Sequence, residues 1–153
     1  MQWMIMPFRR YADFQGRSRR MEFWMFQLFN LIVGLVLAGP VAFSLVSAGL
    51  TDPSMIESAP LSGIGTFGMF GIGLYALYAL AAFIPSIAVT VRRLHDRDLS
   101  GWWYLGAIVA GLIPIVGLLA SVALFVVLLL PGTKGPNRFG PDPKDPFESE
   151  VFA

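Results

Sequence analysis

Charged residues are confined to short segments of the chain, and long apolar segments separate them. No Asp, Glu, Lys or Arg occurs in residues 23–51, 58–91 or 99–133, which are 29, 34 and 35 residues long. About 20 apolar residues in a helix cross the hydrocarbon core of a membrane, so each segment is long enough to span. Continuous apolarity without two-residue alternation favours helices over a barrel. The pattern therefore predicts an all-α, polytopic transmembrane helical bundle.

Two of these segments predict long helices, over about residues 19–48 and 64–94. Bends in the first helix are expected at Gly34, Gly39 and Pro40. The second helix opens with glycines at positions 65, 68, 71 and 73. Small residues let helices approach closely in lipid, so this glycine face is expected to pack against the first helix. Residues 49–63 carry turn-forming pairs and are expected to form a loop.

The third apolar segment, residues 101–130, allows two interpretations. A continuous helix of 30 residues would be about 45 Å long, which is too long for an upright span. Gly111, Pro114 and Gly117 interrupt the segment. One interpretation is a helical hairpin that turns near Pro114 and brings the total to four spans. The alternative is three spans with a long kinked last helix.

The distribution of basic residues predicts the orientation, because Lys and Arg near spanning segments stay on the cytoplasmic side. Five arginines lie in residues 1–22, none lies in residues 49–63, and three lie in residues 92–100. The N-terminus is therefore expected inside. Four spans also place the basic residues of the tail inside, and we adopt that topology. The predicted parts are a cytoplasmic interfacial arm (1–22), a transmembrane domain (23–130) and a polar, Pro-rich cytoplasmic tail (131–153).

The composition narrows the candidate functions. A net charge of +1 gives no reason to expect a nucleic-acid partner. The chain has no cysteine and one histidine, which excludes disulfides, thiolate nucleophiles and multi-histidine zinc sites. It contains no phosphate-binding glycine loop, HExxH or GxSxG motif. We expect no metal and no cofactor, and an enzymatic activity is not favoured.

The densest polar stretch, "RRLHDRDLSGWW", lies between two apolar segments at residues 92–103. Arg93 and Asp96 are three residues apart and are expected to meet at a helix end. His95 precedes Asp96 directly, but adjacent residues do not face each other on a helix, which favours a structural role for the imidazole. Ser100 is expected to cap the third helix, and Gly101 to allow close backbone approach.

The arginines of this stretch allow two interpretations. In the first, they set the topology and contact lipid phosphates. In the second, they belong to an internal network in which Arg17 and Arg20 have Glu22 and Asp98 as partners, and the network ties the first helix to the second and to the tail. Residues 137–140 are expected to form a turn, with Arg138 in the polar layer and Phe139 at the apolar boundary.

Three motifs together resemble the domain of unknown function 805 family, which comprises small bacterial inner-membrane proteins. They are "GRSRRMEFW" (16–24), "RRLHDRDLSGWW" (92–103) and "NRFGPDP" (137–143), and their order and spacing agree over about residues 8–143. The resemblance implies a multi-pass protein of the bacterial inner membrane and supplies no catalytic residue. The motif and network candidates are Gly16, Arg17, Arg20, Glu22, Trp24, Arg92, Arg93, His95, Asp96, Ser100, Gly101, Trp102, Asn137, Arg138 and Gly140.

We therefore expect a structural or interaction module whose Arg-rich cytoplasmic face contacts membrane lipids, a protein partner or a second copy of the chain. One alternative is a transport or channel component, although the three uncharged segments contain no ionisable relay of Asp, Glu, Lys or Arg. The other alternative is a membrane enzyme acting on a phosphorylated lipid, with the arginines as an electrostatic clamp and His95 as acid or base.

Overall fold

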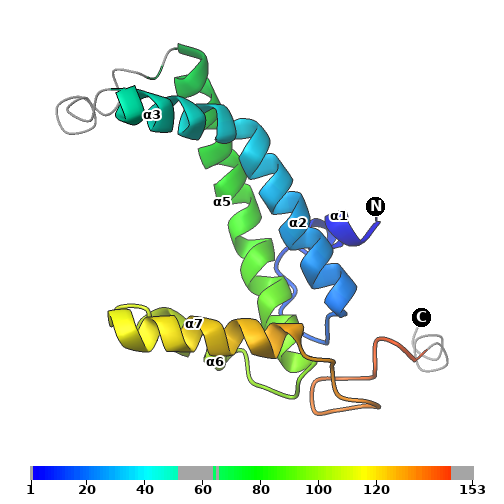
Figure 1. Ribbon diagram of the computed structural model, residues 1–153. Helices are drawn as coiled ribbons and strands as arrows, with labels where there is room; N and C mark the ends of the chain where they lie inside the picture. Colours follow the sequence, from blue (N-terminus) through cyan, green and yellow to red (C-terminus); the bar gives the residue numbers. More distant parts are fainter. Residues whose placement is uncertain (1, 52–63, 65, 146–153) are drawn as a thin grey trace. The chain divides into compact units, whose positions relative to one another are not determined.

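The computed structural model describes residues 2–51, 64 and 66–145 (Figure 1). Within these residues the regular structure consists of helices: α1 (Gln2–Arg9), α2 (Arg20–Leu37), α3 (Gly39–Thr51), α5 (Thr66–His95), α6 (Trp102–Ala110) and α7 (Pro114–Leu129). The predicted all-α fold class is confirmed. Among the described residues, α2 and the part of α5 from Phe67 to His95 are long and apolar enough to cross a membrane, and α7 is shorter.

The first predicted helix is divided into α2 and α3 at Ala38. Helical hydrogen bonds continue through the division, because the Ala38 N–H donates to the Gly34 carbonyl (2.8 Å) and the Ala42 N–H to the Ala38 carbonyl (2.9 Å). Pro40 is the second residue of α3, where its missing N–H costs little. α3 turns away from the direction of α2 (Figure 1), so the bend expected at Gly39 and Pro40 is present, whereas Gly34 lies inside α2. Most of the predicted loop, residues 52–63, lies outside the described residues.

Residues 27–83 form one of two compact units, and glycines of α5 approach the first predicted helix within it. A Cβ atom on Gly71 would lie 2.8 Å from the Leu37 carbonyl oxygen, closer than such atoms normally come. The Tyr78 hydroxyl donates a hydrogen bond to the side-chain oxygen of Asn30. The predicted close packing of the glycine face is confirmed at Gly71, since a side chain there would push the backbones apart.

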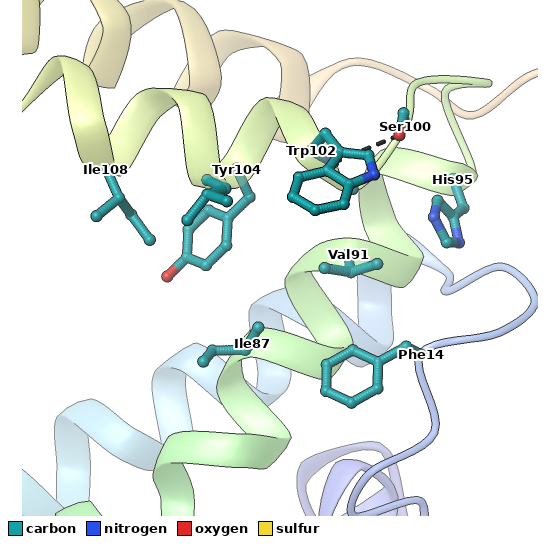
Figure 2. Close-up of a pocket in the computed structure, with 10 residues that line it drawn as sticks. Phe14, Ile87, Val91, His95, Ser100, Trp102, Tyr104 and Ile108 are labelled. Atoms are coloured by element: carbon teal, nitrogen blue, oxygen red, sulfur yellow. Dashed lines mark hydrogen bonds between the residues drawn. The ribbon is translucent and has the colours of Figure 1, made fainter.

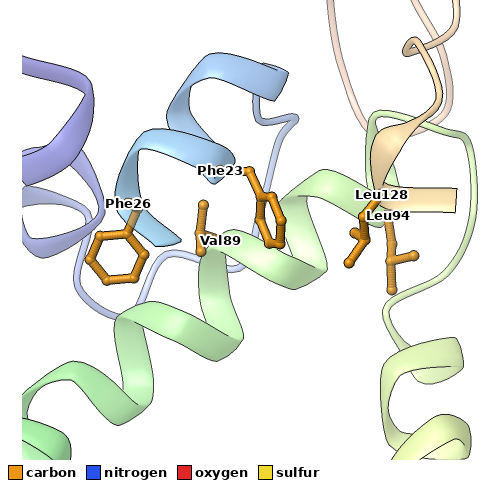
Figure 3. Close-up of a cluster of buried hydrophobic side chains, with 5 residues drawn as sticks. All are labelled: Phe23, Phe26, Val89, Leu94 and Leu128. Atoms are coloured by element: carbon orange, nitrogen blue, oxygen red, sulfur yellow. The ribbon is translucent and has the colours of Figure 1, made fainter. Parts of the chain in front are cut away.

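The second unit contains residues 1–26 and 84–153 and has a small apolar core. Its buried side chains are Phe23, Phe26, Val89, Leu94 and Leu128 (Figure 3). Most large apolar side chains of α6 and α7 point outward instead; Leu118 and Leu119, for example, are about two-thirds exposed. Helices that are apolar all round in a chain with so small a core are solvated by lipid rather than by water.

The segment after residue 101 folds as a helical hairpin. The chain leaves α6 at Gly111 and begins α7 at Pro114, which occupies the first turn as proline favours. The two helices pack closely, because a Cβ atom on Gly117 would lie 2.7 Å from the Gly111 Cα. The structure thus has the predicted hairpin and not the long kinked helix. With nine residues, α6 is about 14 Å long, less than half the hydrocarbon thickness.

Candidate functional site: a buried arginine cluster

Five charged side chains are buried together at one end of the unit formed by residues 1–26 and 84–153. This arginine cluster comprises Arg17, Glu22, Arg92, Arg93 and Asp96, all at most 6% exposed. Arg17 precedes α2, and Glu22 lies in the first turn of that helix. Arg92 and Arg93 lie in the last turn of α5. Positive side chains at a helix C-terminus and a negative one at an N-terminus match the helix dipoles.

The charges of the cluster are paired inside the protein. One oxygen of Asp96 accepts from the Arg17 Nε (3.0 Å), and the other forms an ion pair with Arg93. The Nη2 of Arg92 donates to Glu22 at 2.9 Å. Removing one member of such a pair would leave the other as an unpaired buried charge, which costs several kcal/mol. The predicted contact between Arg93 and Asp96 is present.

Arginines of this region also satisfy the carbonyl groups at the end of α7. The last four carbonyls of a helix have no partner within it, and α7 ends in an extended residue followed by Pro131, without a left-handed glycine cap. Arg93 donates through Nε to the Leu128 carbonyl (3.1 Å) and through Nη2 to that of Leu130. Arg20 reaches the Leu129 carbonyl at 3.3 Å, and Arg97 reaches that of Pro131.

The tail is fastened to the same place. The Thr133 N–H donates to the Asp96 carbonyl (2.8 Å), and the Asn137 side-chain amide donates to that of His95 (2.9 Å). Arg17 donates to the Gly135 carbonyl at 2.6 Å. From the other direction, the backbone N–H of Ser18 donates to the Arg92 carbonyl (3.1 Å). The segment before α2, the end of α5 and the tail therefore form one hydrogen-bonded layer.

The comparisons with known proteins agree with the sequence motifs. The model of the family described as "Protein of unknown function (DUF805)" matches residues 11–141. The chain belongs to this family. Inner membrane protein YhaH of Escherichia coli (strain K12) is 40% identical over 144 residues, which cover 94% of this chain and 98% of YhaH. Inner membrane protein YhaI of the same strain is 38% identical over 144 residues, with 94% and 97% covered. No solved structure matches the chain significantly.

The region shared with the family contains the whole arginine cluster and the tail contacts to His95 and Asp96. The chain is accordingly a helical integral membrane protein of a family of unknown function. Two motif positions have a backbone that favours glycine, since Gly16 has φ +75° and Gly140 has φ +136°. Trp24 lies edge-on to Phe125 of α7, with ring centroids 5.7 Å apart.

The predicted partners of the arginines were wrong in detail. Glu22 pairs with Arg92 and not with Arg17 or Arg20. Asp98 forms an exposed pair with Arg138 at 3.1 Å, because the tail returns beside it. The phosphate-contact interpretation is also wrong for the last turn of α5, since Arg92 is fully buried and its guanidinium contacts protein groups.

His95 is the last residue of α5, and residues of the other two motifs contact its ring. Its Nδ1 lies 3.2 Å from the Gly16 carbonyl oxygen, and its ring stacks on Phe139 with centroids 3.8 Å apart and 4° between the planes. Phe139 was expected at the apolar boundary. The Asn137–Gly140 turn, closed by two 3.0 Å backbone hydrogen bonds, instead holds it over the imidazole. The imidazole is therefore engaged in structural contacts.

An open apolar pocket lies beside His95, between α5 and α6 (Figure 2). Ser100 lies at its rim, and its hydroxyl accepts from the Trp102 N–H at 3.4 Å. The N-cap of α6 is nevertheless Gly101, one residue later than predicted. The predicted close approach at Gly101 is present, because a Cβ atom there would lie 2.7 Å from a methyl group of Val91. Trp102 is 76% exposed.

Two features of the site were not found in the sequence. A Cβ atom on Gly132 would lie 2.0 Å from the Asp96 carboxylate, so only glycine fits there. Asp142 lies 4.0 Å from the Arg17 guanidinium. Burial alone would raise the pKa of Asp142, but backbone N–H groups of Lys144 and Gly135 and the charge of Arg17 together hold that pKa below its ordinary value. Neither feature produces a local sequence pattern, because each depends on the path of the tail.

Proposed function

We propose that the protein is a structural or interaction module of the bacterial inner membrane, with a basic cytoplasmic face that contacts lipid headgroups. The observation that carries the proposal is the convergence of the basic segments. Every Lys and Arg lies in residues 9–20, 92–97 or 134–144. Hydrogen bonds join all three segments in one layer, including those from the Ser18 N–H to the Arg92 carbonyl and from the Asn137 side-chain amide to the His95 carbonyl. A face that collects all basic residues belongs on the cytoplasmic side.

The same layer supports a topology with both termini inside. The α6–α7 hairpin leaves the layer after Asp98 and returns to it at Thr133, whose N–H bonds to the Asp96 carbonyl. The start of α2 and the end of α5 also meet there, through Ser18 and Arg92. Each helix pair therefore departs from and returns to one side. This favours a tail on the same side as the N-terminus over three spans with an external tail.

Contact with headgroups falls to the exposed basic residues, because the buried arginines are engaged by protein groups. The exposed basic residues include Arg9, Lys134, Arg138 and Lys144. A basic side chain near an anionic membrane surface contributes about 1 kcal/mol. The buried cluster gives this face a fixed shape, and the exposed residues give it affinity for the membrane surface. The packed imidazole of His95 supports this role over lipid hydrolysis.

Labelling of introduced cysteines tests the sidedness, since the chain has none of its own. Lys134→Cys should react with an impermeant maleimide in inverted membrane vesicles and remain unlabelled in intact spheroplasts. Ser54→Cys, in the segment between the two predicted spans, should show the opposite pattern. Labelling of position 134 in intact spheroplasts would contradict the proposed topology.

Reconstitution tests the headgroup contact. The protein is placed in nanodiscs of zwitterionic phosphatidylcholine with or without 30% (about one lipid in three) anionic phosphatidylglycerol. We expect a higher unfolding temperature in the anionic discs, and a smaller difference at high salt because exposed charges are screened. Equal unfolding temperatures in both discs at low salt would refute a headgroup-binding face.

A further inference from the structure

A second open pocket, of about 660 Å³, lies next to the arginine cluster, between the first turns of α2 and the end of α7. Three cationic side chains line it: Arg19, Arg20 and Lys144. The rest of its wall is apolar and includes Met21, Trp24 and Met25 of α2 and Leu129 of α7. No acidic residue is among the described residues that line the pocket. The pocket thus joins a basic rim to an apolar floor.

The basic rim differs from the buried cluster in its charge balance. Arg17, Arg92 and Arg93 each have a carboxylate partner, whereas no ion pair to the rim occurs among the described residues. Arg19 lies 5.7 Å from the Trp3 ring centroid, and Arg20 uses one nitrogen on the Leu129 carbonyl. Both guanidiniums retain N–H groups for a ligand, and arginine forks suit phosphate oxygens.

The apolar floor of the pocket favours a phosphate compound that also carries an apolar group. Trp24 is held edge-on to Phe125 of α7, so the gap between the two helices has a firm apolar wall. Met21 is 57% exposed and lines the same pocket. A free phosphate ion would bind the rim and leave this wall bare. An acyl chain attached to the phosphate covers the wall, and basic pockets between membrane helices suit anionic lipid headgroups.

We propose that this pocket binds one anionic phospholipid, with its phosphate among Arg19, Arg20 and Lys144 and the start of an acyl chain against Met21, Trp24 and Met25. The site deepens the proposed function and rests on it, because the pocket must open at the cytoplasmic headgroup level. It adds a discrete site to what is otherwise a diffuse attraction between the basic face and the membrane surface.

Native mass spectrometry of the detergent-purified full chain tests the site. Phosphatidylglycerol, phosphatidylcholine or inorganic phosphate is titrated into the protein, and the fraction carrying one ligand is measured. The pocket variant is Arg19→Gln with Lys144→Gln, and Arg20 is kept because it caps α7. The matched control is Arg9→Gln with Lys134→Gln, which removes the same charge outside the pocket lining.

We expect one phosphatidylglycerol on the wild type, and binding weakened by at most about fivefold in the control, because Arg9 and Lys134 contribute only to the diffuse headgroup attraction. The pocket variant should bind about 25-fold more weakly, since each of its two basic groups near a phosphate contributes a factor of about five. Met25→Trp, which fills the floor and keeps every charge, should weaken binding as well and serves if the charge variant does not fold. Equal weakening in pocket and control variants would overturn the discrete site and leave the proposed headgroup face intact.

Two further results would also be decisive. Equal binding of phosphatidylcholine and phosphatidylglycerol to the wild type would contradict both the site and the basic headgroup face. Displacement of phosphatidylglycerol by millimolar inorganic phosphate, with Met25→Trp binding normally, would identify a free-phosphate site and overturn the lipid proposal. Binding of phosphatidylglycerol that phosphate does not displace and Met25→Trp reduces supports the lipid.

Discussion

Replacement of Arg93 by alanine tests the view that the arginine cluster holds the fold together. The side chain is fully buried, and its three nitrogens serve Asp96 and the carbonyls of Leu128 and Leu130. Its loss leaves Asp96 with only Arg17 and leaves two helix-end carbonyls without their donor. Water cannot replace these three hydrogen-bond donors, because the position is buried.

The expected loss of stability follows from these contacts. Removing one partner of a buried ion pair costs about 3–5 kcal/mol. Arg17 retains the second Asp96 oxygen, which argues for the lower end of about 3 kcal/mol. The orphaned Leu128 carbonyl adds at least about 1 kcal/mol. A total of about 4 kcal/mol lowers the unfolding temperature by about 10 °C in a chain of this size.

The exposed pair of Arg138 with Asp98 provides the matched control. These side chains are 59% and 47% exposed, and such pairs contribute at most about 1 kcal/mol. Thermal unfolding of the detergent-purified variants, followed by the monodisperse fraction in size-exclusion chromatography, measures both losses. Arg93→Lys should fall between them, because one ammonium cannot reach three acceptors. An Arg93→Ala protein as stable as Arg138→Ala would refute the reasoning.

Three other changes probe the rest of the layer. Gly132→Ala should destabilise the protein by about 2 kcal/mol or more, since its Cβ would displace the doubly paired Asp96 carboxylate. His95→Ala should cost about 1 kcal/mol by removing the ring stack with Phe139. Asp142, with its lowered pKa, contributes stability that is complete above its unfolded pKa of about 4 and is lost as the pH falls through the folded pKa. Asp142→Asn should therefore flatten the dependence of the unfolding temperature on pH between about 5 and 3.

Each change has an internal comparison. Gly106→Ala places a methyl group where no atom lies within 4 Å and should be tolerated; equal losses at positions 106 and 132 would contradict the steric argument. His95→Phe keeps the ring stack and should retain most of the stability lost in His95→Ala. Identical stability for the two His95 variants would show that stacking is unimportant. A slope unchanged in Asp142→Asn would mean that other carboxylates govern the acid response.

The helices were predictable from the sequence because lipid imposes a simple pattern. Charge-free segments long enough to span, together with glycine and Pro114 at the turn, indicate α2, α5 and the hairpin from the sequence alone. Local pairs were predictable too: Arg93 and Asp96 meet because one helical turn separates them. The resemblance of the three motifs to the family is shown by the match over residues 11–141.

The non-local pairing was not predictable, because it depends on where the chain goes between motifs. Arg17 and Arg92 are 75 positions apart, and nothing in either neighbourhood says which carboxylate each will meet. The path of the tail adds further contacts that no local pattern predicts. The Thr133 N–H binds the Asp96 carbonyl, Gly132 lies against the Asp96 carboxylate, and Arg138 lies beside Asp98. A polar, Pro-rich tail has no periodic pattern from which such docking follows.

The choice of arginine, rather than lysine, at the end of α5 follows from the way α7 ends. The apolar run continues to Leu130 and stops at Pro131, so the last carbonyls of α7 have no glycine cap. A guanidinium donates to several acceptors at once, and Arg93 satisfies two of these carbonyls while it neutralises Asp96. Lysine would carry the same charge to the same side of the membrane and leave acceptors unsatisfied. The buried arginines therefore close the helix ends, which leaves the exposed basic residues around them for the proposed contact with lipid headgroups.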